Sequence, residues 1–163
     1  KVVRLSLMGK SKIDPVTEEE KARWPKEPLV DLEKPFVDVR GRIQPLLDEA
    51  MKSAVWIESA AGSVRANHYH KTDWHYCYVV SGEMEYFYRK TGSEDEPEKV
   101  VARTGDMVFT PPMVDHAMHF TKDTVFLTLS RNPRDQETYE ADVERVEVIS
   151  TEGLISWKPG DSD

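Results

Sequence analysis

The sequence from Gly62 to Gly82 reads G-S-V-R-A-N-H-Y-H-K-T-D-W-H-Y-C-Y-V-V-S-G and contains His68, His70 and His75, three of the five histidines of this 163-residue chain. The stretch is rich in Val, Tyr and Trp and shows little 3.6-residue periodicity, which favours β-strands. Alternate residues of a strand point to the same face, so we expect His68 and His70 to project together.

A second segment, Gly105 to His116 (G-D-M-V-F-T-P-P-M-V-D-H), adds a fourth histidine from a distant part of the chain. Imidazoles that converge from two strands can bind one divalent ion through their ring nitrogens. We therefore predict a metal site formed by His68, His70 and His116, with His75 as a fourth ligand or as an acid/base group. The alternative is a polar pocket in which these histidines only make hydrogen bonds.

The composition indicates one compact domain and excludes several classes of partner. Apolar residues make up 39% and charged residues 32% of the chain, and 163 residues are enough to form a core. The 30 acidic and 22 basic residues give a net charge of −8, with no basic run, which argues against nucleic acid and membrane partners. No apolar run is long enough to span a membrane, and a single cysteine, Cys77, suits a reducing cytoplasm.

Three regions differ in their sequence pattern. Residues 1–35 are expected to form an N-terminal arm with a short helix, because Thr17 and Glu20 fit a capping box and Pro25 would end the helix. Residues 2–8 are a candidate strand that adds to the edge of a sheet, either in the same chain or in a partner subunit. Residues 36–149 are expected to form the barrel, and residues 150–163 a short tail that docks loosely, if at all.

Short strand patterns alternate with turn signals throughout the middle region, as in an all-β sandwich or barrel. We expect strands near residues 43–47, 53–58, 63–69, 74–80, 83–89, 99–102, 106–110, 117–120, 124–130 and 143–149.

The two histidine segments resemble the two sequence motifs of the cupin superfamily. The first motif is matched by Gly62, His68, His70 and Gly82, with His75 in the place of the family's Glu; the second is matched by Gly105, Pro111 and His116, with Met113 and Phe120 replacing a Gly and an Asn. The resemblance implies a cupin double-stranded β-helix, which is a jelly-roll barrel, with one metal ion inside and often a homodimer. An all-imidazole ligand set suits a divalent transition metal ion, namely Zn, Fe, Ni, Mn or Cu.

A narrower resemblance concerns the substrate. The segment Phe36-Val-Asp-Val-Arg-Gly41 looks like the Phe-x-Asp-x-Arg-Gly segment of deoxysugar-nucleotide epimerases and ketoisomerases with cupin folds, and Val64-Arg65-Ala-Asn-His68 looks like their Arg-Gly-x-His. The likeness implies that Arg65 lies near a substrate phosphate and that His68 is a base or a metal ligand.

These observations favour a metal-dependent isomerase or epimerase that acts on a keto-sugar nucleotide or a similar small carbonyl substrate. Proton removal next to a carbonyl needs a base near neutral pKa, and an arginine can grip a diphosphate. The candidate catalytic residues are His75, His119 and Tyr78, and the candidate substrate-binding residues are Arg40, Arg65, Trp74 and Tyr86. Barrel packing is the alternative role for these aromatic residues, and surface ion pairing is the alternative for the arginines.

Two other functions fit the same ligand set. One is an iron- or copper-dependent dioxygenase, in which three or four histidines hold the metal. The other is a non-catalytic cupin that binds a small acid or sugar.

Overall fold

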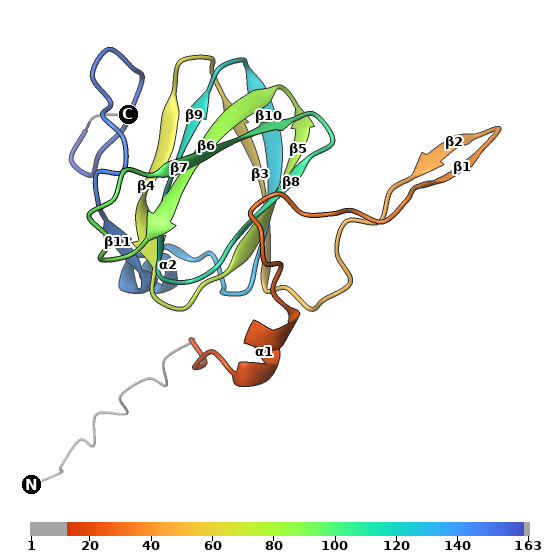
Figure 1. The fold of residues 1–163 in the computed structure, drawn as a ribbon, viewed down its shortest axis with the longest axis horizontal. Helices are drawn as coiled ribbons and strands as arrows, with labels where there is room; N and C mark the ends of the chain where they lie inside the picture. The colour runs from red at the N-terminus through yellow and green to blue at the C-terminus, as the bar shows by residue number, and fades with distance from the viewer. Residues whose placement is uncertain (1–12, 162–163) are drawn as a thin grey trace, which may run out of the picture.

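Two antiparallel β-sheets face each other and form a barrel in the computed structural model, which describes residues 13–161 (Figure 1). One sheet has the strand order β3-β10-β5-β8 and the other the order β11-β4-β9-β6-β7. The barrel strands are β3 (Ser53–Ser59), β4 (Val64–His70), β5 (His75–Ser81), β6 (Glu83–Lys90), β7 (Glu98–Arg103), β8 (Met107–Thr110), β9 (Val114–Phe120), β10 (Thr124–Ser130) and β11 (Val143–Arg145). The expected all-β barrel is confirmed.

The core lies between the two sheets because inward-facing residues alternate along the strands. Val79, Met84, Phe120 and Phe126 are almost completely buried there, and the rings of Phe120 and Phe126 stack at 5.5 Å between centroids. Burial of such side chains stabilises the fold by about 1.5–3 kcal/mol each.

The N-terminal arm packs on the outside of the four-stranded sheet. Its helix α1 (Glu18–Arg23) has the predicted capping box, with the Thr17 side chain accepting from the Glu20 N–H. Beyond the helix, the Val30 N–H donates to the Met107 carbonyl and the Phe109 N–H to the Pro28 carbonyl, at 2.9 and 2.8 Å. The arm thereby covers the exposed edge of β8, which removes a row of unpaired backbone groups.

A small hairpin projects from the barrel (Figure 1). Its strands are β1 (Phe36–Asp38) and β2 (Gly41–Ile43), which within residues 13–161 pair only with each other. The predicted strand over residues 43–47 is wrong, because the chain leaves β2 at Ile43 and reaches Pro45, which cannot donate to a ladder. The candidate edge strand over residues 2–8 lies outside the described residues.

The last part of the chain also differs from expectation. A helix that was not expected, α2 (Gln136–Asp142), precedes β11, and the predicted strand over residues 143–149 is regular only as far as Arg145. The tail beyond it is attached to the barrel at one point, where Ile155 bridges to Ser63 in parallel orientation. None of the helices in residues 13–161 is long and apolar enough to cross a membrane.

Candidate metal centre and its cavity

Four histidine side chains meet at one end of the barrel core. β4 supplies His68 and His70, β5 supplies His75 and β9 supplies His116. The ring centroid of His68 lies 4.7 Å from that of His70 and 4.8 Å from that of His116. The His75 centroid lies 5.6 Å from those of both His70 and His116. Imidazoles from two segments far apart in the sequence are therefore neighbours in space.

A β-bulge in β4 orients the first histidine. Ala66 and Asn67 both have positive φ, 67° and 55°, which is unusual for residues other than glycine. The pairing of β4 with β9 shifts register there, and His68 then stands opposite His116. Bulges of this kind re-aim side chains near functional sites.

The geometry of three histidines fits a metal ion. Ligand atoms of His68, His70 and His116 all lie within 4.8 Å of one another. The Nδ1 atom of His116 lies 2.9 Å from the Val114 carbonyl oxygen, so Nδ1 carries the proton and Nε2 keeps its lone pair. That Nε2 is buried and has no hydrogen-bond partner. A buried nitrogen with a free lone pair is costly unless a ligand occupies it, so the donor set suits a transition metal ion.

The environment keeps these three rings neutral, which is the form that binds metal. Burial lowers the pKa of His68, His70 and His116, and repulsion from neighbouring imidazoles adds to the effect. His75 behaves differently. Burial opposes its protonation, but Asp73 and Cys77 beside the ring outweigh burial and raise the pKa of His75 to about 9.

Two buried carboxylates stand behind the histidines. Asp142, at the end of α2, lies 3.4 Å from the His70 Nδ1, and Asp73 lies 3.6 Å from the His75 Nδ1. Asp142 also accepts hydrogen bonds from the Thr72 N–H and hydroxyl and from the Asp73 N–H. Asp73 lies in the turn between β4 and β5, where the alternation of strand side chains does not apply.

The histidines line a cavity of about 380 Å³ that opens to solvent. Ile57, Met118 and Phe126 form apolar parts of its wall. Its exposed rim carries Trp157 and three arginines, Arg65, Arg134 and Arg145, and the half-buried Tyr139 also lines the cavity. Apolar walls with a few convergent polar groups are typical of small-molecule sites.

Of the predicted substrate-binding arginines, Arg65 lies at this rim. Its Nε donates to the Ser59 hydroxyl at 2.7 Å and its Nη2 to the Glu58 carbonyl at 2.9 Å, so the guanidinium is held in place. Arg40 lies on the projecting hairpin instead, where it pairs with Asp38. The prediction for Arg40 is therefore wrong for the cavity of its own chain.

Two of the predicted catalytic residues lie outside the cavity, and these predictions are corrected. His116 and Met118 line the cavity, and His119, which directly follows Met118, points to the opposite face of β9. There its Nδ1 lies 2.9 Å from Glu85 Oε1. Tyr78 is likewise out of phase with His75 and packs outside the barrel with Trp74 and Tyr76.

Two predicted substrate-binding aromatic residues have packing roles instead. Trp74 contacts Trp24 and Phe109 under the arm, and its Nε1 donates to Glu20. Tyr86 is fully buried in the core, and its hydroxyl lies 2.8 Å from that of Thr110. Neither side chain lines the histidine cavity.

Several site residues escaped the sequence analysis because they lie on and around α2. Tyr139 stands 5.5 Å from His70 between ring centroids, and Arg134 lies 4.4 Å above the Tyr139 ring. The sequence signal that could have predicted α2 is Asp135, whose side chain caps the helix by accepting a hydrogen bond from the Thr138 N–H. An Asp at this position before a polar run is a helix start signal.

Comparisons with known proteins agree with the fold. The family model described as Cupin domain matches residues 55–130. No curated protein matches the chain significantly. The sugar 3,4-ketoisomerase QdtA from Thermoanaerobacterium thermosaccharolyticum, as a double mutant with TDP, is similar with 22% identity, a TM-score of 0.59 and coverage of 72% of this chain and 85% of that one.

Two further solved structures are similar. dTDP-4-dehydrorhamnose 3,5-epimerase from Sulfolobus tokodaii has 18% identity and a TM-score of 0.54, with 65% of this chain and 70% of that chain covered. The capsular polysaccharide assembling protein CapF from Staphylococcus aureus has 22% identity and a TM-score of 0.55, with 74% and 35% covered. At these identities the likeness concerns the fold. Residues 55–130, which match the Cupin domain model, include the three strands that carry all four clustered histidines, and the barrel has the cupin fold.

Proposed function

We propose that this cupin is a metal-dependent isomerase or epimerase acting on a keto-sugar nucleotide. The observation that carries the proposal is one cavity that combines clustered imidazoles inside with three arginines at its rim. The imidazoles suit proton transfer next to a carbonyl, and the arginines suit a diphosphate. Two of the similar folds bear the names of enzymes that act on such sugars, which supports the same substrate class.

His68, His70 and His116 would hold the divalent ion. Support comes from their neutral state, the proximity of their ligand atoms and the unpartnered Nε2 of His116. A bound transition metal ion would supply Lewis-acid chemistry at the substrate carbonyl oxygen.

His75 is the residue we assign to proton transfer. It lines the same cavity and stands outside the three-histidine group, and Asp73 lies beside its Nδ1. In the proposed step the neutral form of the His75 imidazole, which is the minor form at pH 7 because its pKa is raised to about 9, takes a proton from the carbon next to the carbonyl, and the C–H electron pair forms an enolate. Return of the proton to the former carbonyl carbon, while the proton of the adjacent hydroxyl passes to the enolate oxygen, moves the carbonyl. Return of the proton to the other face of the original carbon inverts its configuration.

The arginines would bind the diphosphate and fix the sugar in the cavity. Arg134 makes no ion pair within residues 13–161, and Arg65 bonds only to a hydroxyl and a carbonyl. Both guanidiniums therefore keep their charge available in a chain whose net charge is −8. Local cations of this kind attract an anionic substrate despite the overall charge.

Solvent isotope exchange tests the proposal. The metal-loaded protein is incubated in D2O with TDP-4-keto-6-deoxyglucose, and proton NMR follows the carbons next to the carbonyl. We expect deuterium incorporation that falls by at least about 100-fold in His75→Ala, since general acid–base groups contribute about 10²–10⁴-fold. The matched control is His119→Ala, which should exchange at the wild-type rate.

The other functions predict other outcomes. Oxygen uptake with Fe(II) and no deuterium exchange would support the dioxygenase. Binding of the sugar nucleotide without exchange or oxygen uptake would support a non-catalytic cupin. Either result would contradict the proposed isomerase. The three arginines at the rim favour the isomerase because they could bind the diphosphate of its substrate, whereas activation of oxygen requires no arginine.

A further inference from the structure

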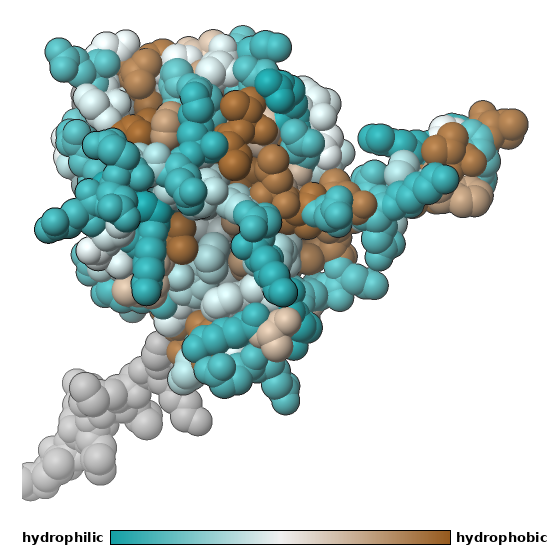
Figure 2. Space-filling model, viewed as in Figure 1, coloured by the Kyte–Doolittle hydropathy of each residue, from teal (hydrophilic) through white to brown (hydrophobic). Residues whose placement is uncertain are grey.

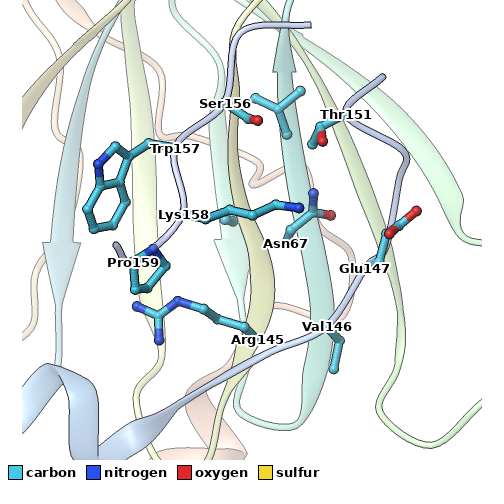
Figure 3. Close-up of a pocket in the computed structure, with 11 residues that line it drawn as sticks. Asn67, Arg145, Val146, Glu147, Thr151, Ser156, Trp157, Lys158 and Pro159 are labelled. Carbon is cyan, nitrogen blue, oxygen red and sulfur yellow. The ribbon is translucent and has the colours of Figure 1, made fainter. Parts of the chain in front are cut away.

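A second cavity, of about 270 Å³, lies beside the histidine cavity (Figure 3). It is formed between the tail, residues 151–159, and the bulged part of β4 with the segment that follows β11. Val64, Ala66, Arg145 and Trp157 line both cavities, so the two are contiguous. The second cavity alone is small for a sugar nucleotide, because sites for small molecules commonly measure about 300–1,000 Å³.

The tail that covers this second cavity is fixed to the barrel. The Val64 N–H donates to the Ile155 carbonyl at 2.8 Å, and the Ile155 N–H donates to the Gly62 carbonyl at 2.9 Å. Farther along, the Asp161 carboxylate accepts from the Lys158 N–H at 2.7 Å and closes a turn. Trp157 therefore follows directly after the residues attached to the barrel, and Lys158 begins a local turn of the tail.

The opposite wall is tied to the histidine site through Asn67. Its Oδ1 accepts from the N–H groups of Val148 and Ile149 at 3.0 and 3.1 Å, and its carbonyl accepts from the Val146 N–H. Asn67 belongs to the β-bulge that immediately precedes His68. One local structure thus shapes this wall and aims the first histidine.

The side chains of the second cavity suit a nucleotide. The Trp157 indole is 59% exposed, and no ring within residues 13–161 stacks on it. The Lys158 ammonium has no carboxylate partner in the same range, and Figure 3 shows it reaching across the cavity toward Asn67. Arg145 stands at the junction of the two cavities and pairs with Glu140 at 2.9 Å.

Neutral and acidic groups complete the lining. Thr151 and Ser156 offer hydroxyls, and Glu147 offers a carboxylate that can accept from base N–H or ribose hydroxyl groups. Glu147 would repel a phosphate placed next to it, so the phosphates belong at the Arg145 end of the cavity.

We infer that the second cavity binds the nucleoside part of a nucleoside diphosphate sugar, with the base stacked on Trp157. The diphosphate then lies at the junction, with Lys158 on one side and the three rim arginines on the other, and the sugar enters the histidine cavity. This inference rests on the proposed function, since it names where the rest of that substrate is held. A stacking aromatic surface beside cations is a general means of binding nucleotides.

Calorimetric titration with thymidine, uridine and guanosine diphosphates tests the inference. At least one of them should bind the wild-type protein. Trp157→Ala should weaken that binding on the order of tenfold, because it removes the ring on which the base would stack. Lys158→Ala should weaken it several-fold and reduce its salt dependence. The control is Trp56→Ala, because Trp56 is equally exposed, at 60%, on the outer face of β3.

Failure of this inference is distinguishable from failure of the proposed function. No binding of any of the three diphosphates, or equal dissociation constants for wild type and Trp157→Ala, would overturn the nucleoside site even where deuterium exchange occurs. Tight binding that depends on Trp157 but is accompanied by no exchange would leave the nucleoside site standing and remove the isomerase.

Discussion

At the scale of single residues, the chemistry depends on which ring nitrogen carries a proton. His116 shows this most clearly, because the Val114 carbonyl holds the proton on Nδ1 and leaves the buried Nε2 as a lone-pair donor. Strand alternation was enough to predict that His68 and His70 share a face. It did not identify Tyr139 or Asp142, because their positions depend on a helix that packs against the barrel.

Metal content of single variants tests the assignment of ligands. We expect His68→Ala and His116→Ala to lose nearly all bound transition metal, because each removes one of three ligands. His119→Ala should retain it, because that side chain contacts Glu85 outside the cavity. Mass spectrometry of the purified proteins gives the metal-to-protein ratio. Equal ratios in all three variants would refute the assignment.

At the scale of elements, helix α1 is attached to the barrel mainly through Glu20. Its carboxylate accepts from Arg131 on the barrel and from the Trp74 indole, besides closing the capping box with Thr17. Burial alone would raise the pKa of Glu20, but these hydrogen bonds outweigh it and lower the pKa to about 2. The sequence predicted the capping box, which is local, but not the contact with Arg131, which lies 111 positions away.

The lowered pKa predicts a pH dependence of stability. Because the folded pKa lies below the ordinary value of 4.5, the ionised Glu20 stabilises the fold above that pH. Its contribution should decline as the pH falls from about 4.5 to about 2. Glu20→Gln should therefore lower the free energy of unfolding by about 1 kcal/mol at pH 7.

Denaturant unfolding of wild type and Glu20→Gln across this pH range measures the effect. The difference between the two proteins should shrink as the pH falls toward 2. Glu19→Gln is the matched control, since Glu19 is exposed on the same helix turn. A difference that persists unchanged at pH 2 would contradict the role given to Glu20.

The turn between β5 and β6 predicts a second effect on stability. Gly82 has a φ of 109°, and a Cβ at this position would collide with the side chain and backbone of Thr124. Gly82→Ala should destabilise the fold by about 2 kcal/mol or more. Gly92→Ala is the control, because Gly92 also has positive φ but nothing within 4 Å of an added Cβ.

Thermal or denaturant unfolding compares the two variants directly. The collision makes Gly82→Ala the more destabilising of the two. If both lost the same stability, the close approach of Thr124 would have no energetic consequence.

At the scale of the whole molecule, the projecting hairpin exposes apolar side chains that no other described part of the same chain covers. Figure 2 shows apolar surface on the hairpin, where the exposed apolar residues are Phe36, Val37, Val39 and Ile43. An isolated two-stranded hairpin is marginally stable in water. The homodimer expected from the sequence remains a proposal, in which a second copy of the chain covers this hairpin.

Light scattering after size exclusion tests the dimer. We expect a mass near twice the 18.7 kDa of the chain, and a monomer for the double variant Phe36→Ser, Val37→Asp. A Trp56→Ser variant, which removes an exposed apolar side chain from the barrel instead, should remain dimeric. A monomeric wild type at micromolar concentration would contradict the proposal.

The barrel was more predictable than the elements attached to it. Its strands follow from alternation and from glycine turns, and both signals are local. Residues 36–43 had been included in the barrel, but they form the projecting hairpin, because nothing in a local pattern shows where a strand finds its partner. The aromatic residues Trp74 and Tyr78 were misassigned for a related reason, since the outer face of β5 is covered by an arm that sequence patterns do not place.

The most direct test of the account is an anomalous diffraction scan of a crystal of the metal-loaded protein. We expect one transition metal peak about 2.0–2.2 Å from ring nitrogens of His68, His70 and His116. A metal-loaded crystal with no peak inside the barrel, or with an ion bound by other residues and these three imidazoles unliganded, would contradict it.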